Sequence, residues 1–356
     1  MKRRQFLSGL IGMPLMPALT RLFPNRLPNS FQDFAKGFQG YSSPQVVRRF
    51  AFGSCAEQSR PQPIWNQIKE TSPDVFAFIG DNIYADTTNR EEIRAKYETL
   101  ASLPEFAKFR SNVPIIAMWD DHDFGVNDGG REYPFKAHNK EIMLDFWGEP
   151  KNSPRRNREG CYVSYYYGPR PFRLQVIMMD LRWFRSPLLY GTKGEYAPNF
   201  DPEATILGAD QWQWLESELR KPADFRILVS TIQMVSSDHH WEKWANFPLD
   251  KARLMALIDR EKIDNLVVVS GDMHFAELSV EKTPAGFSLY DLTSSGLNIT
   301  ESASAIANSK RLLLFDQGHN FGLVSIDWSA RPRRVLLEVR NASGVAVIQK
   351  ELHFPV

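Results

Sequence analysis

Residues 74–86 read DVFAFIGDNIYAD. The first part of this stretch, residues 74–79, is a short, mostly apolar run that predicts a buried parallel strand, and Gly80-Asp81 ends it. The same pattern returns in residues 113–123, VPIIAMWDDHD, where an apolar run ends in consecutive polar residues. Helical patterns accompany these strands at residues 64–70, 91–100 and 137–146. Strands that alternate with helices in this way predict an α/β fold with parallel strands.

The pattern extends toward both ends of the chain. A strand is predicted at residues 46–52, directly before Gly53-Ser54-Cys55. Toward the C-terminus, apolar runs predict strands at residues 174–179, 227–230 and 266–270, and helices at residues 209–219 and 250–258. Beyond Phe287 apolar and polar residues alternate between short turns, which predicts a β-rich C-terminal part.

Composition and charge narrow the classes of function. The chain has 356 residues, of which 43% are hydrophobic, enough to fill a substantial core. Its 43 Lys and Arg residues against 42 Asp and Glu residues give a net charge of +1, so nothing in the charge predicts a nucleic-acid partner. Cys55 and Cys161 are the only cysteines, too few for a disulfide framework. They either form one disulfide, or Cys55 serves as a metal ligand.

The N-terminus has the layout of an export signal. Met1-Lys-Arg-Arg precedes an apolar stretch at residues 6–19 that is too short and too interrupted to span a bilayer. Arg3-Arg4 followed by Gln-Phe-Leu resembles a twin-arginine signal, which implies export of a folded protein by the twin-arginine machinery. We therefore expect residues 1–29 to be a signal and lead, and the protein to reach the periplasm, the cell surface or the medium. Residues 30–356 are expected to form a single catalytic domain, since no repeat or linker divides residues 46–356.

Potential metal ligands follow four of the predicted strands. In open α/β sheets, ligands bind beyond the carboxyl ends of the strands. Asp and Asn are common there because they favour turns, but turn chemistry does not explain His and Tyr at matching positions. The residues in question are Cys55 after the first strand, Asp81, Asn82 and Tyr84 after the second, Asp120 to Asp123 after the third, and Asp272 and His274 after residues 266–270. Together they predict a dinuclear metal site.

Four of these segments resemble a known family. Cys55, GDNIYAD (80–86), WDDHDFG (119–125) and GDMHFAE (271–277) are similar to the alkaline phosphatase D branch of the calcineurin-like metallophosphoesterases. Further stretches share the resemblance: LRWFRSP (181–187), WEKWANFP (241–248), TSSGLN (293–298) and HNFGLVSIDW (319–328). The resemblance implies a four-layer αββα sandwich with mixed sheets, and two metals at one edge.

The resemblance also implies which residues hold each metal. It assigns the first metal to Cys55, Asp81, Tyr84 and His274, where a thiolate and a phenolate suit a ferric ion. Asp81 would bridge to a second metal, held in addition by Asp121 and Asp272. Oxygen ligands favour calcium, manganese or magnesium over zinc, and on the resemblance we expect calcium.

By the same resemblance, the chain hydrolyses phosphomonoesters, phosphodiesters or both, through attack of a hydroxide held between the metals. His122 would act near the leaving oxygen, with Asp81 and Asp121 as the other catalytic residues. Substrate contacts are expected from three residues: Asn127, whose neighbour Asp128 would be an outer-sphere acceptor; Arg182, which could alternatively pair with Asp180; and Gln233, which stands where many relatives have a ligand.

Two alternatives remain open at this point. One is a phosphodiesterase or phospholipase C-like enzyme acting on envelope lipids or polymers. The other is a catalytically silent descendant that binds a phosphorylated ligand. The loop of residues 238–249, with Trp241 and Trp244, is expected to wall the site, and His239 and His240 are expected to be rim or packing residues. We expect a monomer.

Overall fold

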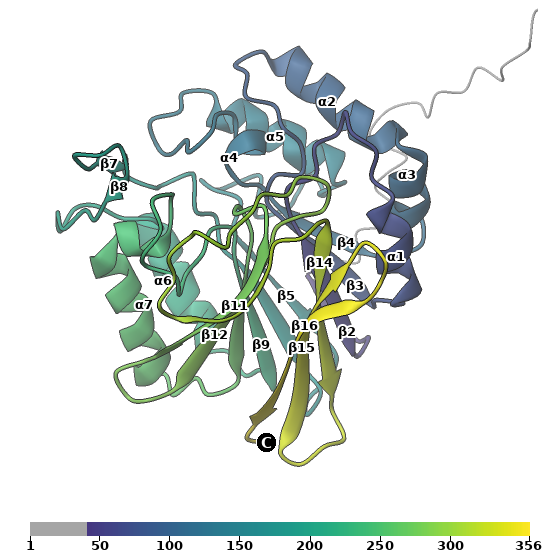
Figure 1. Cartoon of the computed structure of the whole chain (residues 1–356), viewed down its shortest axis with the longest axis vertical. Helices are drawn as coiled ribbons and strands as arrows, with labels where there is room; N and C mark the ends of the chain where they lie inside the picture. Colours follow the sequence, from purple (N-terminus) through teal and green to yellow (C-terminus); the bar gives the residue numbers. More distant parts are fainter. Residues whose placement is uncertain (1–40) are drawn as a thin grey trace, which may run out of the picture.

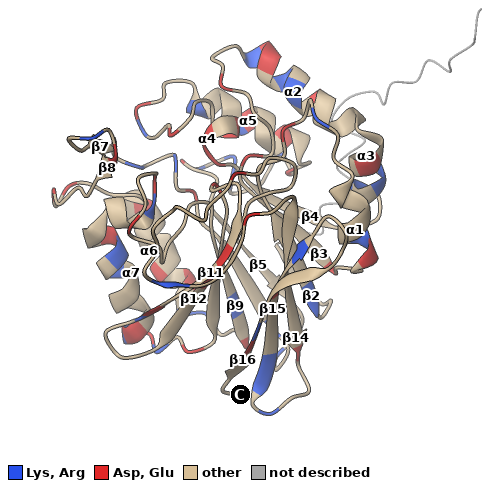
Figure 2. Cartoon of the chain, in the orientation of Figure 1, with Lys and Arg blue, Asp and Glu red and all other residues tan. Residues whose placement is uncertain are grey.

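The computed structural model describes residues 41–356 and shows two β-sheets packed face to face between layers of helices (Figure 1). The predicted signal at residues 1–29, and the first residues of the predicted catalytic domain, lie outside the described part. Among residues 41–356, no helix combines the length and the apolar character needed to cross a membrane. Figure 2 shows acidic and basic residues interspersed over the helices and loops, in keeping with the near-zero net charge.

The first sheet has six strands in the order β16-β15-β14-β2-β3-β4. Strands β2, β3 and β4 run parallel, so their carboxyl ends meet at one edge, while β14 to β16 form an antiparallel meander beside β2. The strands are β2 (Arg49–Gly53), β3 (Val75–Ile79), β4 (Ile115–Met118), β14 (Asn320–Asp327), β15 (Arg333–Asn341) and β16 (Ala346–Phe354).

The second sheet has eight strands in the order β1-β5-β6-β9-β10-β12-β11-β13, with β6, β9, β10 and β12 parallel. Its strands are β1 (Ser42–Ser43), β5 (Val163–Tyr167), β6 (Leu174–Met178), β9 (Phe225–Ser230), β10 (Leu266–Ser270), β11 (Ala276–Lys282), β12 (Ser288–Ser294) and β13 (Arg311–Phe315). A separate hairpin pairs β7 (Leu189–Tyr190) with β8 (Tyr196–Ala197).

The helices form the two outer layers. In Figure 1, α6 and α7 lie beside the second sheet and α1 and α3 lie on the side of the first sheet. The helices are α1 (Ile64–Glu70), α2 (Arg90–Ser102), α3 (Pro104–Arg110), α4 (Asp121–Phe124), α5 (Lys136–Phe146), α6 (Gly208–Leu219) and α7 (Pro248–Arg260), with a 3₁₀ turn at Trp244–Asn246. The predicted four-layer αββα sandwich of mixed sheets is therefore present.

Side-chain alternation along the parallel strands explains the layers. In β9, Ile227 and Val229 belong to the core between the two sheets, whereas Leu228 belongs to a separate core that includes Trp212 of α6 and Leu254 of α7. Successive residues of a strand point to opposite faces, so a continuous apolar run serves both cores at once. This is why the central strands carry no polar face in the sequence.

The structure contains elements that the apolar pattern did not predict, among them α3, β5, β11 and β13. Helix α3 is a single short segment, and β5 reads VSYYY, whose serine and tyrosines interrupt an apolar signal. Strand β13 has no buried residue and β11 ends exposed. Short or half-exposed segments like these are fixed by pairing with distant strands rather than by their own composition.

Candidate metal centre

The predicted ligands gather where β2, β3, β4 and β10 end, at the same edge of the two sheets. Four of them have a positive φ: 63° at Cys55, 47° at Asp81, 72° at Asp272 and 59° at His274. For residues other than glycine this conformation costs about 1–3 kcal/mol each, and it is concentrated at functional sites. The backbone is therefore bent sharply at each of these positions, and the packed sheets must sustain that strain.

One glycine makes the approach of two strand ends possible. Gly80, directly before Asp81, has a φ of 107°, and a Cβ atom there would lie 2.5 Å from the Cβ of Asp120. Only glycine tolerates both the angle and the contact. The Gly80-Asp81 pair thus brings the end of β3 against the end of β4.

The four residues predicted for the first metal come together. The Sγ atom of Cys55 lies 3.3 Å from Oδ2 of Asp81, and the phenol oxygen of Tyr84 lies 3.3 Å from the same oxygen and 3.0 Å from Nε2 of His274. Ligand atoms of Cys55, Asp81 and His274 all lie within 4.8 Å of one another. That spacing suits a single ion among them.

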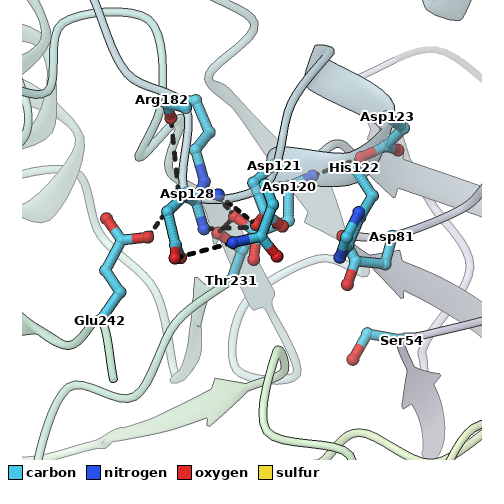
Figure 3. A network of polar contacts seen from close by, with 12 residues as sticks. Ser54, Asp81, Asp120, Asp121, His122, Asp123, Asp128, Arg182, Thr231 and Glu242 are labelled. Carbon is cyan, nitrogen blue, oxygen red and sulfur yellow. Dashed lines mark hydrogen bonds and ion pairs between the residues drawn. The ribbon is translucent and has the colours of Figure 1, made fainter. Parts of the chain in front are cut away.

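A second group of ligand atoms shares Asp81. Atoms of Asp81, Asp121 and His122 lie within 4.8 Å of one another, as do atoms of Asp120, Asp121 and Asp272. Figure 3 shows the Asp120 to Asp123 segment facing Asp81 across the site. The residues predicted for the second metal are thus neighbours, with Asp81 in the position of a bridge.

The electrostatics of this cluster fit bound cations. Burial, together with the charges of Cys55 and Asp121, raises the pKa of Asp81 well above its usual value, and burial raises that of Cys55 to about 11. Asp272 is raised in the same way, by burial and by the charge of Asp121. In addition, Oδ1 of Asp81 and Oδ1 of Asp121 are buried without a hydrogen-bond partner. Buried acidic oxygens of this kind are normally satisfied by a positive partner, and metal ions at these positions would provide it.

Two of the polar residues at the strand ends, Asn82 and Asp123, bond to each other and to the backbone. Asn82 donates from Nδ2 to the carbonyl of Met118 at 2.8 Å and also to Asp123. Asp123 in turn accepts a 2.7 Å hydrogen bond from the backbone N–H of Asp120 through Oδ1. These bonds tie the loop after β3 to the start of α4, whereas Oδ1 of Asn82 is buried without a hydrogen-bond partner.

His122 has a partner that the sequence did not reveal. Its Nδ1 atom lies within 2.8 Å of both carboxylate oxygens of Asp86, and its ring lies 4.2 Å from the ring of Tyr84. Asp86 also accepts a hydrogen bond from the backbone N–H of Asn127 at 3.1 Å. The only sequence signal for Asp86 was its place at the end of GDNIYAD.

Beside these residues is a pocket of about 260 Å³. It is lined by His122, Asn127, Asp128, Trp241, Asp272, Met273, His274, Glu301 and Ile306. His122, Asn127 and the expected wall residue Trp241 therefore face the space that a substrate would enter. Trp244, the other expected wall residue, is fully buried in the core under α6 and α7 and donates to Ser230 Oγ, so that expectation was wrong.

Two of the predicted substrate contacts require correction. Arg182 has no exposed surface, because its guanidinium pairs with Asp120 at 2.5 Å and with Glu242 (Figure 3). Gln233 is also buried, and its Nε2 donates to Glu277 and Thr293. Neither side chain lines the pocket, since buried polar partners hold both. The proposed pairing of Arg182 with Asp180 exists only through the backbone N–H of Arg182.

Burial and bonding also decide between the alternatives for the cysteines and locate His239 and His240. Cys55 and Cys161 are both buried free thiols, so the disulfide alternative was wrong. His239 is buried beside Trp241 and His240 is exposed, positions of packing and rim residues.

Comparisons with known proteins identify a family and a fold. Residues 50–335 match the family model of PhoD-like phosphatases. Alkaline phosphatase D of Bacillus subtilis (strain 168) is 21% identical over 287 residues, and the match covers 66% of this chain and 47% of that protein. The chain thus spans about half the length of this curated relative.

Solved structures support the fold. A structure of PhoD is similar with a TM-score of 0.68 at 15% identity, covering 87% of this chain and 72% of the other. A dimetal phosphatase from Danio rerio has a TM-score of 0.53 at 12% identity, covering 87% of this chain and all of the other (100%). Both likenesses confirm the predicted metallophosphoesterase architecture.

Proposed function

The chain belongs to the PhoD-like phosphatase family, and we propose that it is an exported, metal-dependent phosphoesterase that hydrolyses phosphomonoesters, phosphodiesters or both. One observation carries the proposal: the two groups of ligand atoms share Asp81 and stand beside His122, which lines the pocket. A hydrolase needs both features, since the phosphate must reach the metals and a proton donor at the same time.

The proposed ligands follow from the observed contacts. Cys55, Tyr84 and His274 would hold a ferric ion together with Asp81, because the thiolate sulfur and the phenolate oxygen are anionic donors that suit ferric iron. Asp121 and Asp272, again with Asp81, would hold calcium, or otherwise manganese, magnesium or zinc. Metal ions at these positions would neutralise phosphate charge and lower the pKa of an attacking water.

The chain's own residues complete the proposed mechanism. Asp86 holds Nδ1 of His122, which leaves Nε2 as the atom that can give a proton to the departing oxygen or hold the phosphate. Asn127, which also lines the pocket, would donate to a phosphate oxygen. Asp128 keeps the loop in place, since its backbone N–H donates to Oδ2 of Asp121 at 2.7 Å.

Export is part of the proposal and rests on the Arg3-Arg4 pattern of the sequence, outside the described residues. Folding before export would let the metals be loaded in the cytoplasm, and residues 30–356 would then act as one catalytic domain. The substrate would be a small-molecule, lipid or polymer phosphate ester, and the protein would act as a monomer.

The decisive experiment compares hydrolysis of para-nitrophenyl phosphate and bis-para-nitrophenyl phosphate at alkaline pH with calcium. The protein and its Asp81→Asn variant are measured side by side, with Asp264→Asn, an exposed residue, as the matched control. We expect Asp81→Asn to reduce turnover by about a thousandfold, because the bridging charge supplies several kcal/mol, and the control to stay near wild type. If metal-replete protein cleaves neither ester, the silent-descendant alternative gains support.

A further inference from the structure

The charges around the pocket are unusual for a site that receives a phosphate. Within residues 41–356, no lysine or arginine lines the pocket. Two cations that contact rim residues donate to their backbone oxygens: Lys243 Nζ donates to the carbonyl of Trp241 at 2.9 Å, and Arg311 Nη1 donates to that of Ile306 at 3.0 Å. These cations hold the rim residues in place, so His122 and His274 are the basic side chains among the residues that line the pocket.

The charged lining residues beyond the proposed ligands and His122 are acidic. Asp128 is engaged, since Oδ2 accepts from the hydroxyl of Tyr196 at 2.6 Å and from Asn127 at 2.8 Å. Glu301 differs, because its side chain is 63% exposed at the mouth of the pocket. Its backbone N–H donates to the carbonyl of His274 at 2.9 Å, which fixes the main chain of Glu301 at the pocket mouth.

We propose that Glu301 is a specificity-determining residue, a charge filter that disfavours doubly charged phosphates and so favours diesters over monoesters. The inference rests on the proposed phosphoesterase function of the same site. A terminal phosphate carries two negative charges at alkaline pH, and a diester carries one. A carboxylate at the mouth repels the first more strongly, and no lysine or arginine of the lining offsets that repulsion.

The rest of the rim suits the second substituent of a diester. Trp241, Met273 and Ile306 form the apolar part of the lining, and Trp241 is 44% exposed. An aromatic ring with a free face and a flexible thioether are good partners for an apolar or planar group. Repulsion of the dianion and attraction of a second substituent therefore act in the same direction.

The test measures binding separately from turnover. Phenylphosphonate, a dianion, and its monomethyl ester, a monoanion, are non-hydrolysable probes whose affinities for the metal-replete protein are measured by calorimetry at pH 9 and low salt. For Glu301→Gln we expect the preference for the monoanion to fall about fivefold, mainly because the dianion binds more tightly, and we expect this change to shrink at high salt. Glu301→Asp, which keeps the charge, should retain the preference.

A matched control variant and a competing role of Glu301 define which results would support the charge filter and which would refute it. Glu351→Gln removes the same charge from an exposed side chain of β16 and should leave both affinities unchanged. Oε1 of Glu301 also lies 3.5 Å from Nδ1 of His274. The competing role is therefore that Glu301 orients the ring of His274 and has no effect on charge selectivity. In that case Glu301→Gln would weaken both probes by the same factor, and the charge filter would be refuted. A shifted preference in a protein that turns over neither nitrophenyl ester would uphold the filter and count against the hydrolytic function.

Discussion

The Nδ1 atom of His122 lies 2.7 Å from Oδ2 of Asp86, across the gap between the loop after β3 and the start of α4. The contact fixes the plane of the imidazole, because the second carboxylate oxygen lies 2.8 Å from the same nitrogen and the ring of Tyr84 packs against one face. A histidine held at one nitrogen presents the other in a defined direction. Asp86 is therefore a positioning residue for His122.

Asp86→Asn should lower kcat by about tenfold to a hundredfold while KM changes little. The reason is that the His122 ring is no longer held by the carboxylate, so its Nε2 atom is no longer oriented for proton transfer. The loss should be larger for phenyl phosphate than for para-nitrophenyl phosphate, because the poorer leaving group depends more on a proton donor. Steady-state kinetics on the two esters, with metal content measured in parallel, check this. Equal losses on both esters would show that Asp86 only stabilises the fold.

Tyr84→Phe should remove or shift a visible absorption band of the purified protein. The phenol oxygen of Tyr84 lies 3.0 Å from Nε2 of His274 and 3.3 Å from Oδ2 of Asp81, within reach of an ion held by those residues. A phenolate on ferric iron absorbs visible light, and phenylalanine cannot provide one. Tyr133→Phe is the control, since its hydroxyl donates to the carbonyl of Thr87. A colourless, iron-free and active wild-type protein would contradict the assignment.

Arg182→Met should reduce the free energy of unfolding by about 3–5 kcal/mol, because it leaves Asp120 and Glu242 buried without their cation. Arg334→Met removes an exposed partner of Asp327 and should cost about 1 kcal/mol or less. Chemical denaturation of the two variants measures the difference. Similar values for both would mean that the buried pairs contribute no more than surface ones.

The sequence was sufficient for the parallel strands and for the residues at their ends, because apolar runs and the polar residues that stop them are local signals. It did not show that Asp120 is held by Arg182, or that His122 is held by Asp86, since those pairings join segments that meet only in the folded chain. Arg182 shows the limit most clearly. An arginine after a strand has the same local signature whether it binds phosphate or a buried carboxylate, and only the burial of its guanidinium distinguishes the two.

Trp241→Ala should weaken turnover of bis-para-nitrophenyl phosphate by about three- to tenfold more than that of the monoester, because the exposed face of Trp241 is the largest apolar surface of the pocket rim. Trp214→Ala is the control: Trp214 packs on Tyr162, and neither residue lines the pocket. Rates on both esters give the ratio. Equal loss on the two esters would remove Trp241 as a platform for the second substituent.

His239 gives the protein a pH-dependent stability that can be measured without any substrate. The side chain is 5% exposed, and neither ring nitrogen has a hydrogen-bond partner. Burial, with the charge of Lys243 in the same direction, lowers the pKa of His239 to about 3, against about 6.5 in an unfolded chain. As the pH falls below about 6.5, His239 therefore becomes protonated in the unfolded chain but stays neutral in the folded protein. The free energy of unfolding declines until the pH reaches about 3.

His239→Phe should flatten this dependence. Between pH 7.5 and pH 5 the wild-type protein should lose about 2 kcal/mol more of its unfolding free energy than the variant, because a shift of this size accumulates about 1.4 kcal/mol per pH unit below 6.5. Urea denaturation of both proteins at the two pH values measures the difference. Comparing the two proteins cancels the contribution of every other titrating group, because both proteins share those groups. His240→Gln, at the neighbouring exposed position, should keep the wild-type slope. If His239→Phe shows that slope as well, His239 takes up its proton as readily in the folded protein as in the unfolded chain, and its burial has no effect on its charge.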